Sequence, residues 1–169
     1  MKKLLIMILS FALMTAQVFG EPRREPASNK QERNGLVYVI NEQTPFTGIL
    51  FAHYANGQTQ KEWSYKDGKI DGIGKEWYEN GQLKYEGNFR AGKEHGVIKY
   101  WYENGKPENE WRFNEGKEHG IFKTWHPNGK LKNELPFNDG KIDGIAKYWD
   151  ENGLPTGEVT FQNGEPLKQ

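Results

Sequence analysis

The residues best suited to chemistry are two histidines at equivalent places, His95 and His119, with Asp71 and Asp143 at the matching places on either side. Imidazole and carboxylate groups are common metal ligands, and they bind a zinc ion at about 2 Å. The four residues follow one another at intervals of 24. If each interval spans two neighbouring strands, successive side chains lie about 10 Å apart and cannot converge on one ion. The pattern therefore predicts no metal site, and we interpret these residues as polar caps of turns.

Other groups for catalysis are few. Beyond residue 20 the serines are Ser28 and Ser64, and neither lies in the glycine-flanked turn of a serine nucleophile. The chain has no cysteine, which excludes thiol catalysis, thiolate metal sites and disulfides. No glycine cluster precedes a helix to hold a phosphate, and the spacing of calcium-binding loops is absent. The sequence predicts a protein that is not an enzyme and has no cofactor.

A 24-residue repeat must position whatever side chains this protein uses. Of the 20 glycines, 15 fall into three columns that keep the period without an insertion or deletion. A fixed period of this length is typical of repeat proteins. The columns are Gly48, Gly72, Gly96, Gly120 and Gly144; Gly57, Gly81, Gly105, Gly129 and Gly153; and Gly68, Gly92, Gly116, Gly140 and Gly164. The units they define are 48–71, 72–95, 96–119, 120–143 and 144–167.

Each unit has the pattern of a β-hairpin. In the second unit, the strand-like segments 73–78 and 83–89 flank Asn80 and Gly81. Asn-Gly between two such segments is a strong hairpin signal, because both residues tolerate positive φ. No window shows the apolar period of a helix. We expect an all-β fold, an elongated single-layer antiparallel meander of repeated hairpins with about eleven strands.

Three apolar columns are predicted to build the core, because a repeat sheet has little else to bury. They are Ile73, Val97, Ile121 and Ile145; Trp77, Trp101, Trp125 and Trp149; and Phe89, Phe113, Phe137 and Phe161. The length of the Asn-Gly turn decides which faces the columns occupy. A two-residue turn places Lys75 opposite Glu86, repeats this pair in the next three units, and puts the Trp and Phe columns on opposite faces. A three-residue turn gathers both columns on one face and loses the pairs. We favour the two-residue turn.

A tyrosine follows the Trp position in the first three units and is the candidate binding position. These residues are Tyr54, Tyr78 and Tyr102, and His126 and Asp150 replace them in the last two units. Such variation is typical of a surface. If one aromatic column contacts a partner, a glycan or a lipid headgroup, we expect it to be this one.

The N-terminal part has three segments. Residues 1–20 have the charged start, apolar run and small residues of a secretory signal peptide, so we expect export to the periplasm, the outer surface or the medium. Residues 21–35 are polar and are predicted to be a disordered linker. Residues 36–47 form a leading half-repeat whose strand covers the first edge of the array, which continues to residue 167.

The charge balance speaks against nucleic-acid binding. Without residues 1–20 the chain has 21 basic and 23 acidic residues, a net charge of −2. No basic stripe of the kind that contacts a phosphate backbone stands out.

The segment 85–96, YEGNFRAGKEHG, resembles the MORN repeat, which combines a tyrosine, a glycine and an aromatic residue with a later Gly-Lys-x-x-Gly. The 24-residue period and the string WYENGQ at 77–82 are more similar to the MORN-variant repeat of bacterial proteins, which are often named YwqK-family antitoxins or are exported repeat proteins. The resemblance covers residues 36–167. It implies a scaffold or membrane-associated role, since MORN repeats occur in such proteins. The chain departs from the MORN pattern in keeping the glycine between the tyrosine and the phenylalanine only as Gly87. We expect no appended enzymatic domain.

Three functions follow as hypotheses. The first is an exported, non-enzymatic scaffold that presents repeated side chains to a protein partner. The second is an antitoxin that neutralises a toxin by direct binding. The third is a binder of glycans or of another cell-envelope component, by likeness to other aromatic-rich hairpin repeats.

Overall fold

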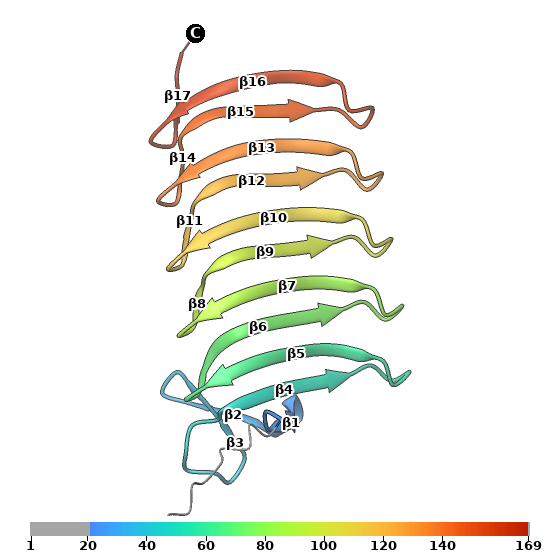
Figure 1. The fold of residues 1–169 in the computed structure, drawn as a ribbon, viewed down its shortest axis with the longest axis vertical. Helices are drawn as coiled ribbons and strands as arrows, with labels where there is room; N and C mark the ends of the chain where they lie inside the picture. The colour runs from blue at the N-terminus through green and yellow to red at the C-terminus, as the bar shows by residue number, and fades with distance from the viewer. Residues whose placement is uncertain (1–20, 169) are drawn as a thin grey trace, which may run out of the picture.

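The computed structural model describes residues 21–168, and β-strands make up nearly all of its regular structure (Figure 1). The expected signal peptide, residues 1–20, lies outside the described residues. Within 21–168, no helix has the length and apolar character needed to cross a membrane.

A single long sheet runs through the five units. Its ten long strands follow one another in sequence order, each antiparallel to its neighbours, so the predicted elongated meander of hairpins is confirmed (Figure 1). The strands are β4 (Gly48–His53), β5 (Thr59–Lys66), β6 (Lys69–Trp77), β7 (Leu83–Arg90), β9 (Gly96–Trp101), β10 (Pro107–Asn114), β12 (Gly120–Trp125), β13 (Leu131–Asn138), β15 (Gly144–Trp149) and β16 (Pro155–Gln162).

The strand count is higher than the eleven expected. Seventeen strands lie in the described residues, because Arg24–Pro26 and Lys30–Arg33 are also strands and because four short separate strands form where a unit ends. Both β8 and β9 pair with β7, and Gly96 kinks the chain between them with a φ of 79°. The short strands made in this way are β8 (Lys93–Glu94), β11 (Lys117–Glu118), β14 (Lys141–Ile142) and β17 (Glu165–Pro166).

The N-terminal segment is ordered, which corrects the expectation of a disordered linker over 21–35. It contains β1 (Arg24–Pro26), the 3-10 turn η1 (Ala27–Asn29) and β2 (Lys30–Arg33). The expectation failed because backbone pairing and ion pairs order these residues, together with the packing of Ala27 against an apolar cluster. Strand β1 pairs in parallel with β4, and Arg23 binds Glu42 at 2.6 Å.

The leading strand also differs from its prediction. Strand β3 (Leu36–Val39) pairs with β2 in a separate two-stranded sheet, so β1 covers the first edge of the array in its place. The small sheet packs on the first unit through the most enclosed apolar cluster of the described residues. Its members are Val37, Val39, Phe46 and Leu50.

The hairpin turns differ from the two-residue turn that Asn-Gly predicts. Gly81 has a φ of 85° and its N–H donates to the carbonyl of Tyr78 at 2.9 Å, but Asn80 keeps a negative φ. This is a type I turn that ends in a left-handed glycine. Turns with positive φ at both central residues lie at the other edge of the sheet, for example at Ala91 and Gly92.

The register that the two-residue turn predicted is nevertheless present. The pairing shifts by one residue between Glu76 and Trp77, which compensates for the longer turn and restores Lys75 opposite Glu86. The same pairs recur as Lys99–Glu110, Lys123–Glu134 and Lys147–Glu158. Since side chains alternate between faces, this register leaves the Ile and Trp positions on one face and the Phe positions on the other.

The core lies on the face that carries the Phe column, here called the aromatic face. The rings of Trp111 and Phe122 stack at 3.6 Å between centroids, and those of Trp63 and Tyr85 at 5.5 Å. Gly87 allows this packing, because a Cβ there would lie 2.1 Å from the hydroxyl of Tyr85. The aromatic face therefore depends on rings from several strands that cover one another.

The predicted Ile column is not part of the core. Ile73, Ile121 and Ile145 are 50%, 41% and 48% exposed. Because successive side chains of a strand point to opposite faces, the residue after each member of the Ile column points toward the aromatic face instead. Ile98 and Ala146, which follow Val97 and Ile145, are 1% and 0% exposed. The other predicted core residues are half-buried: Trp77, Trp101, Trp125, Trp149, Phe89, Phe113, Phe137, Phe161 and Val97.

Candidate functional site: the ladder face of the sheet

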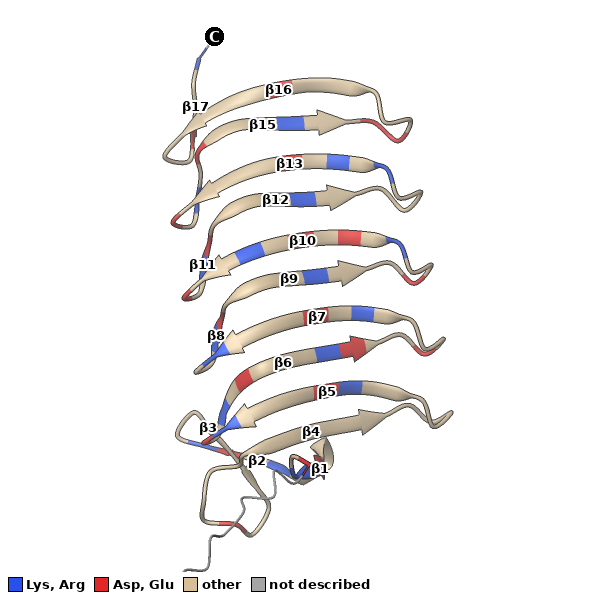
Figure 2. Cartoon of the chain, in the orientation of Figure 1, with Lys and Arg blue, Asp and Glu red and all other residues tan. Residues whose placement is uncertain are grey.

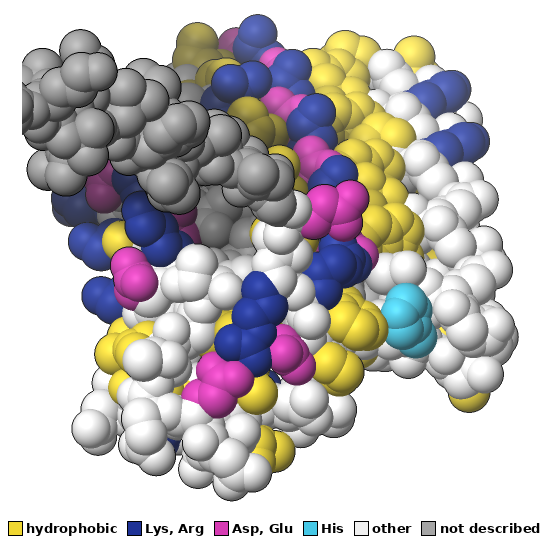
Figure 3. Space-filling model, turned by 60° about the horizontal axis from the view of Figure 1, so that its bottom comes forward, with side chains coloured by type: hydrophobic (Ala, Val, Ile, Leu, Met, Phe, Trp, Pro, Cys, Tyr) yellow, Lys and Arg dark blue, Asp and Glu magenta, His cyan; other side chains and the backbone are white. Residues whose placement is uncertain are grey.

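The face opposite the aromatic face carries a ladder of alternating charges, and we call it the ladder face. Each charged residue lies directly opposite the next on the neighbouring strand, from β5 to β16. The ladder runs along the middle of the stack (Figure 2) and is visible as alternating basic and acidic side chains (Figure 3). Its members are Glu62, Lys75, Glu86, Lys99, Glu110, Lys123, Glu134, Lys147 and Glu158.

The ladder neutralises its own charge. The Nζ–Oε distances are 2.8 Å for Lys75–Glu86 and 3.0 Å for Lys123–Glu134. Arg24 binds Glu62 at the N-terminal end. Each exposed ion pair contributes little to stability, but their succession leaves a long surface without an excess of either sign. Such a surface does not select a partner by net charge.

Two apolar columns flank the ladder. On the side of the unit connections lie the exposed isoleucines, Ile73, Ile121 and Ile145. On the side of the Asn-Gly turns lies a row in which tryptophans alternate with smaller residues. Successive pairs of this row are Trp77 with Leu83, Trp101 with Pro107, Trp125 with Leu131 and Trp149 with Pro155. We call this the Trp row.

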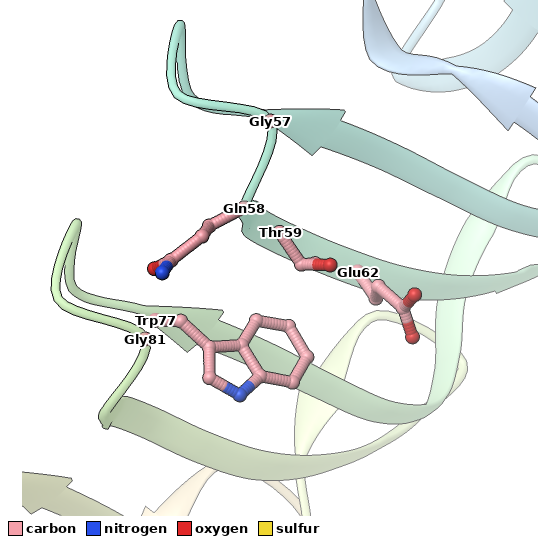
Figure 4. A pocket seen from close by; sticks show the side chains of 6 residues that line it. All are labelled: Gly57, Gln58, Thr59, Glu62, Trp77 and Gly81. Carbon is pink, nitrogen blue, oxygen red and sulfur yellow. The ribbon is translucent and has the colours of Figure 1, made fainter.

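A shallow cleft opens over the Trp row at its first tryptophan. The indole of Trp77, on β6, lines it together with the side chains of Gln58, Thr59 and Glu62 in and just before β5 (Figure 4). The cleft has a volume of about 410 Å³. A second cleft of about 270 Å³ lies farther along the row, between Trp101 and Trp125. The Trp row thus presents ring surfaces beside polar groups at more than one place.

The candidate partner-binding tyrosines have a structural contact. The hydroxyls of Tyr54, Tyr78 and Tyr102 each donate to the carbonyl of the tryptophan in the next unit, all at 2.7 Å. His126 takes the same place, with Nε2 3.0 Å from the carbonyl of Trp149. Binding of a partner by these tyrosines stays a prediction, but their hydroxyls are already used between units.

Asp150 occupies the position of the tyrosine column in the last unit, and its hydrogen bonds explain the change of residue. Within the described residues no further tryptophan carbonyl follows Trp149, and the Asp150 carboxylate instead accepts from the N–H groups of Asn152 and Leu154 at 2.9 and 2.8 Å. The residue changes because its hydrogen-bond partner changes.

Sequence reasoning missed the role of the asparagine column. The amide of Asn80 donates to the carbonyl of Glu103 at 3.0 Å, while its Oδ1 accepts from the N–H of Gln82 at 2.9 Å. Asn56, Asn104 and Asn128 make the same two contacts. The invariant spacing of these residues was the available signal, but it was assigned only to the turn.

Among the residues interpreted as turn caps, Asp71 makes such a contact, and Thr47, one unit earlier in the same column, makes another. The carboxylate of Asp71 accepts from the N–H of Ala91, and the hydroxyl of Thr47 from the N–H of Asp67, both at 2.9 Å. His95 instead has Nδ1 3.7 Å from the carboxylate of Glu115. No cluster of three or more His, Asp or Glu side chains suited to a metal is present between residues 21 and 168.

Comparison with known proteins finds five repeats that begin at intervals of 24 residues. A family model described as the MORN repeat variant matches residues 46–67, 70–91, 94–115, 118–139 and 142–163, which together make up more than half of the chain. No curated protein matches the chain.

Proposed function

Because this chain belongs to the MORN repeat variant family, we propose that it is a non-enzymatic scaffold that binds a protein partner through its ladder face. Repeats of this family are generally modules that bind proteins or membranes. The observation that carries the proposal is the exposure of Ile73, Ile121 and Ile145 in one line. Apolar side chains gathered at a surface in this way mark interaction sites.

The remainder of the ladder face supports a protein partner. The Lys–Glu pairs provide a polar strip without net charge next to the isoleucines, which resembles the mixture of apolar centre and polar rim in protein interfaces. Because the pattern repeats with each unit, a partner makes the same contacts several times. Many weak contacts in a fixed geometry add up to a specific interaction.

Photo-crosslinking tests the binding surface. A benzophenone amino acid at position 121 is expected to trap one defined protein in the native cells. The matched control is position 103, an exposed residue in an Asn-Gly turn away from the isoleucines. Failure to trap any protein from positions 73, 121 and 145 would exclude the isoleucine column as the interface.

We further propose that the protein is exported and acts outside the cytoplasm. The residues that support this proposal are 1–20, with their pattern of a signal peptide. The alternative is an antitoxin of the YwqK kind, which meets its toxin in the cytoplasm. The intact mass of the native protein in each cell fraction separates them: a chain that starts at Glu21 in an extracytoplasmic fraction supports export, and a full-length chain in the cytoplasm contradicts it.

A further inference from the structure

We propose that the Trp row is a binding platform for a neutral, extended polysaccharide with β-linkages, in addition to the protein interface on the other side of the ladder. The first argument is the accessibility of the indoles. Trp77, Trp101, Trp125 and Trp149 are half-buried, and no hydrogen bond within residues 21–168 uses their ring N–H groups. These N–H groups are also absent from the buried, unpaired polar atoms of the same residues, so they reach solvent.

The second argument is the spacing of the rings. The tryptophans lie on β6, β9, β12 and β15, which are every second strand of the sheet. Strands in a sheet are about 4.8 Å apart, so neighbouring indoles are separated by about 10 Å. In an extended β-linked polysaccharide alternate sugars present the same ring face, and the disaccharide that separates them has about this length. Successive indoles can therefore stack on every second sugar of one straight chain.

The third argument is the fixed position of each ring. The backbone carbonyl of Trp101 accepts the hydroxyl of Tyr78, and that of Trp125 accepts the hydroxyl of Tyr102. Leu83, Pro107 and Leu131 fill the row between the indoles. The platform therefore exists before the ligand arrives, which reduces the entropy lost on binding.

The charges around the row favour a neutral polymer. Beside the cleft between Trp101 and Trp125, Lys99 and Glu110 neutralise each other at 3.6 Å. The neighbouring turns expose charges of both signs, so they give an anionic chain no net attraction. These residues are Glu79, Glu103, Lys106, Lys130 and Glu151. The polar groups that remain, such as Gln58 and Thr59 beside Trp77, suit sugar hydroxyls (Figure 4).

Calorimetry and tryptophan fluorescence with soluble oligosaccharides test the platform on the full chain. Cellohexaose is expected to bind, and more tightly than cellobiose, because only the longer ligand reaches more than one indole. Maltohexaose is the matched control, since its α-linkages coil the same number of glucose units. Equal binding of cellohexaose and maltohexaose, or no binding of cellohexaose, would overturn the proposal.

Variants connect the binding to the row. Trp101→Leu together with Trp125→Leu is expected to weaken cellohexaose binding at least about tenfold. Trp101→Tyr with Trp125→Tyr retains two aromatic rings and keeps most of the affinity, so it distinguishes stacking from misfolding. Ile121→Ser, across the ladder, leaves cellohexaose binding unchanged. Unchanged affinity in the leucine variant contradicts the platform, and crosslinking from position 121 remains an independent test of the protein interface.

Discussion

At the scale of single residues, two polar columns connect each unit to the next. The tyrosine hydroxyls bond to tryptophan carbonyls, and the asparagine amides bond to carbonyls of the next turn. Both columns lie at the edge formed by the Asn-Gly turns. They contribute stability by satisfying backbone groups that the turns leave without partners in the ladder of strands.

Replacing one asparagine tests the combined contribution of its contact between units and its contact in the turn. Asn104→Ala is expected to lower the free energy of unfolding by about 1–2 kcal/mol, because it removes two hydrogen bonds. The matched control is Asn152→Ala, since no hydrogen bond of the Asn152 side chain occurs in residues 21–168. Urea unfolding measures the free energy of unfolding of both variants, and equal losses would contradict a contribution of these two hydrogen bonds to stability.

One buried and two half-buried tyrosines predict instability in alkali. Burial is the main cause that raises the pKa of Tyr65, Tyr85 and Tyr100 above the usual value for tyrosine. Because the pKa of each tyrosine is higher in the folded state, the stability that the three protonated side chains contribute is fully present below pH about 10. This stability is lost as the pH rises through their folded-state pKa values. Tyrosinate absorbance and circular dichroism are expected to change together above that pH. Tyr85→Phe should move the transition to higher pH, and a transition that stays in place would contradict this cause.

At the scale of the hairpin, the sequence predicted the register but not the turn. Lys75 and Glu86 revealed the register because complementary charges opposite each other are a local signal. The turn type at Gly81 was not predictable from Asn-Gly, since a bulge beside Trp77 lets a longer turn give the same register. The exposure of Ile73 was missed for another reason. Which face becomes the core depends on rings from several units, such as Trp63 over Gly74.

The two faces make opposite predictions for tryptophan. Trp111→Ala is expected to cost about 3–5 kcal/mol, because Trp111 stacks on Phe122 and packs against Phe137 on the aromatic face. Trp101→Ala, in the Trp row, is expected to cost less. Chemical denaturation of both variants measures the difference. A larger loss for Trp101 would place the core on the ladder face.

At the scale of the whole molecule, the charge ladder is continuous rather than a set of separate pairs. Lys99 lies opposite Glu86 on one side and Glu110 on the other. Every internal member of the ladder therefore has two partners of opposite sign.

Charge exchange tests this continuity. The double variant Lys99→Glu, Glu110→Lys keeps opposite charges at positions 99 and 110 but places like charges opposite Glu86 and Lys123. Its melting temperature is therefore expected to stay below that of the original protein. Exchanging Lys147→Glu and Glu158→Lys disturbs one contact, with Glu134, and should cost less. If the Lys99→Glu, Glu110→Lys variant had the melting temperature of the original protein, the pairs would act independently.

The order of charges within a unit also bears on how such an array grows in evolution. In each unit from the second onward, the first long strand contributes a lysine to the ladder and the second contributes a glutamate, for example Lys75 and Glu86. A tandem duplication of one 24-residue segment therefore joins to both neighbours without a clash of charge, whereas a duplication of a single strand does not. One genetic event can therefore lengthen or shorten the protein by a whole unit. The charges at the new junction are complementary without any further mutation.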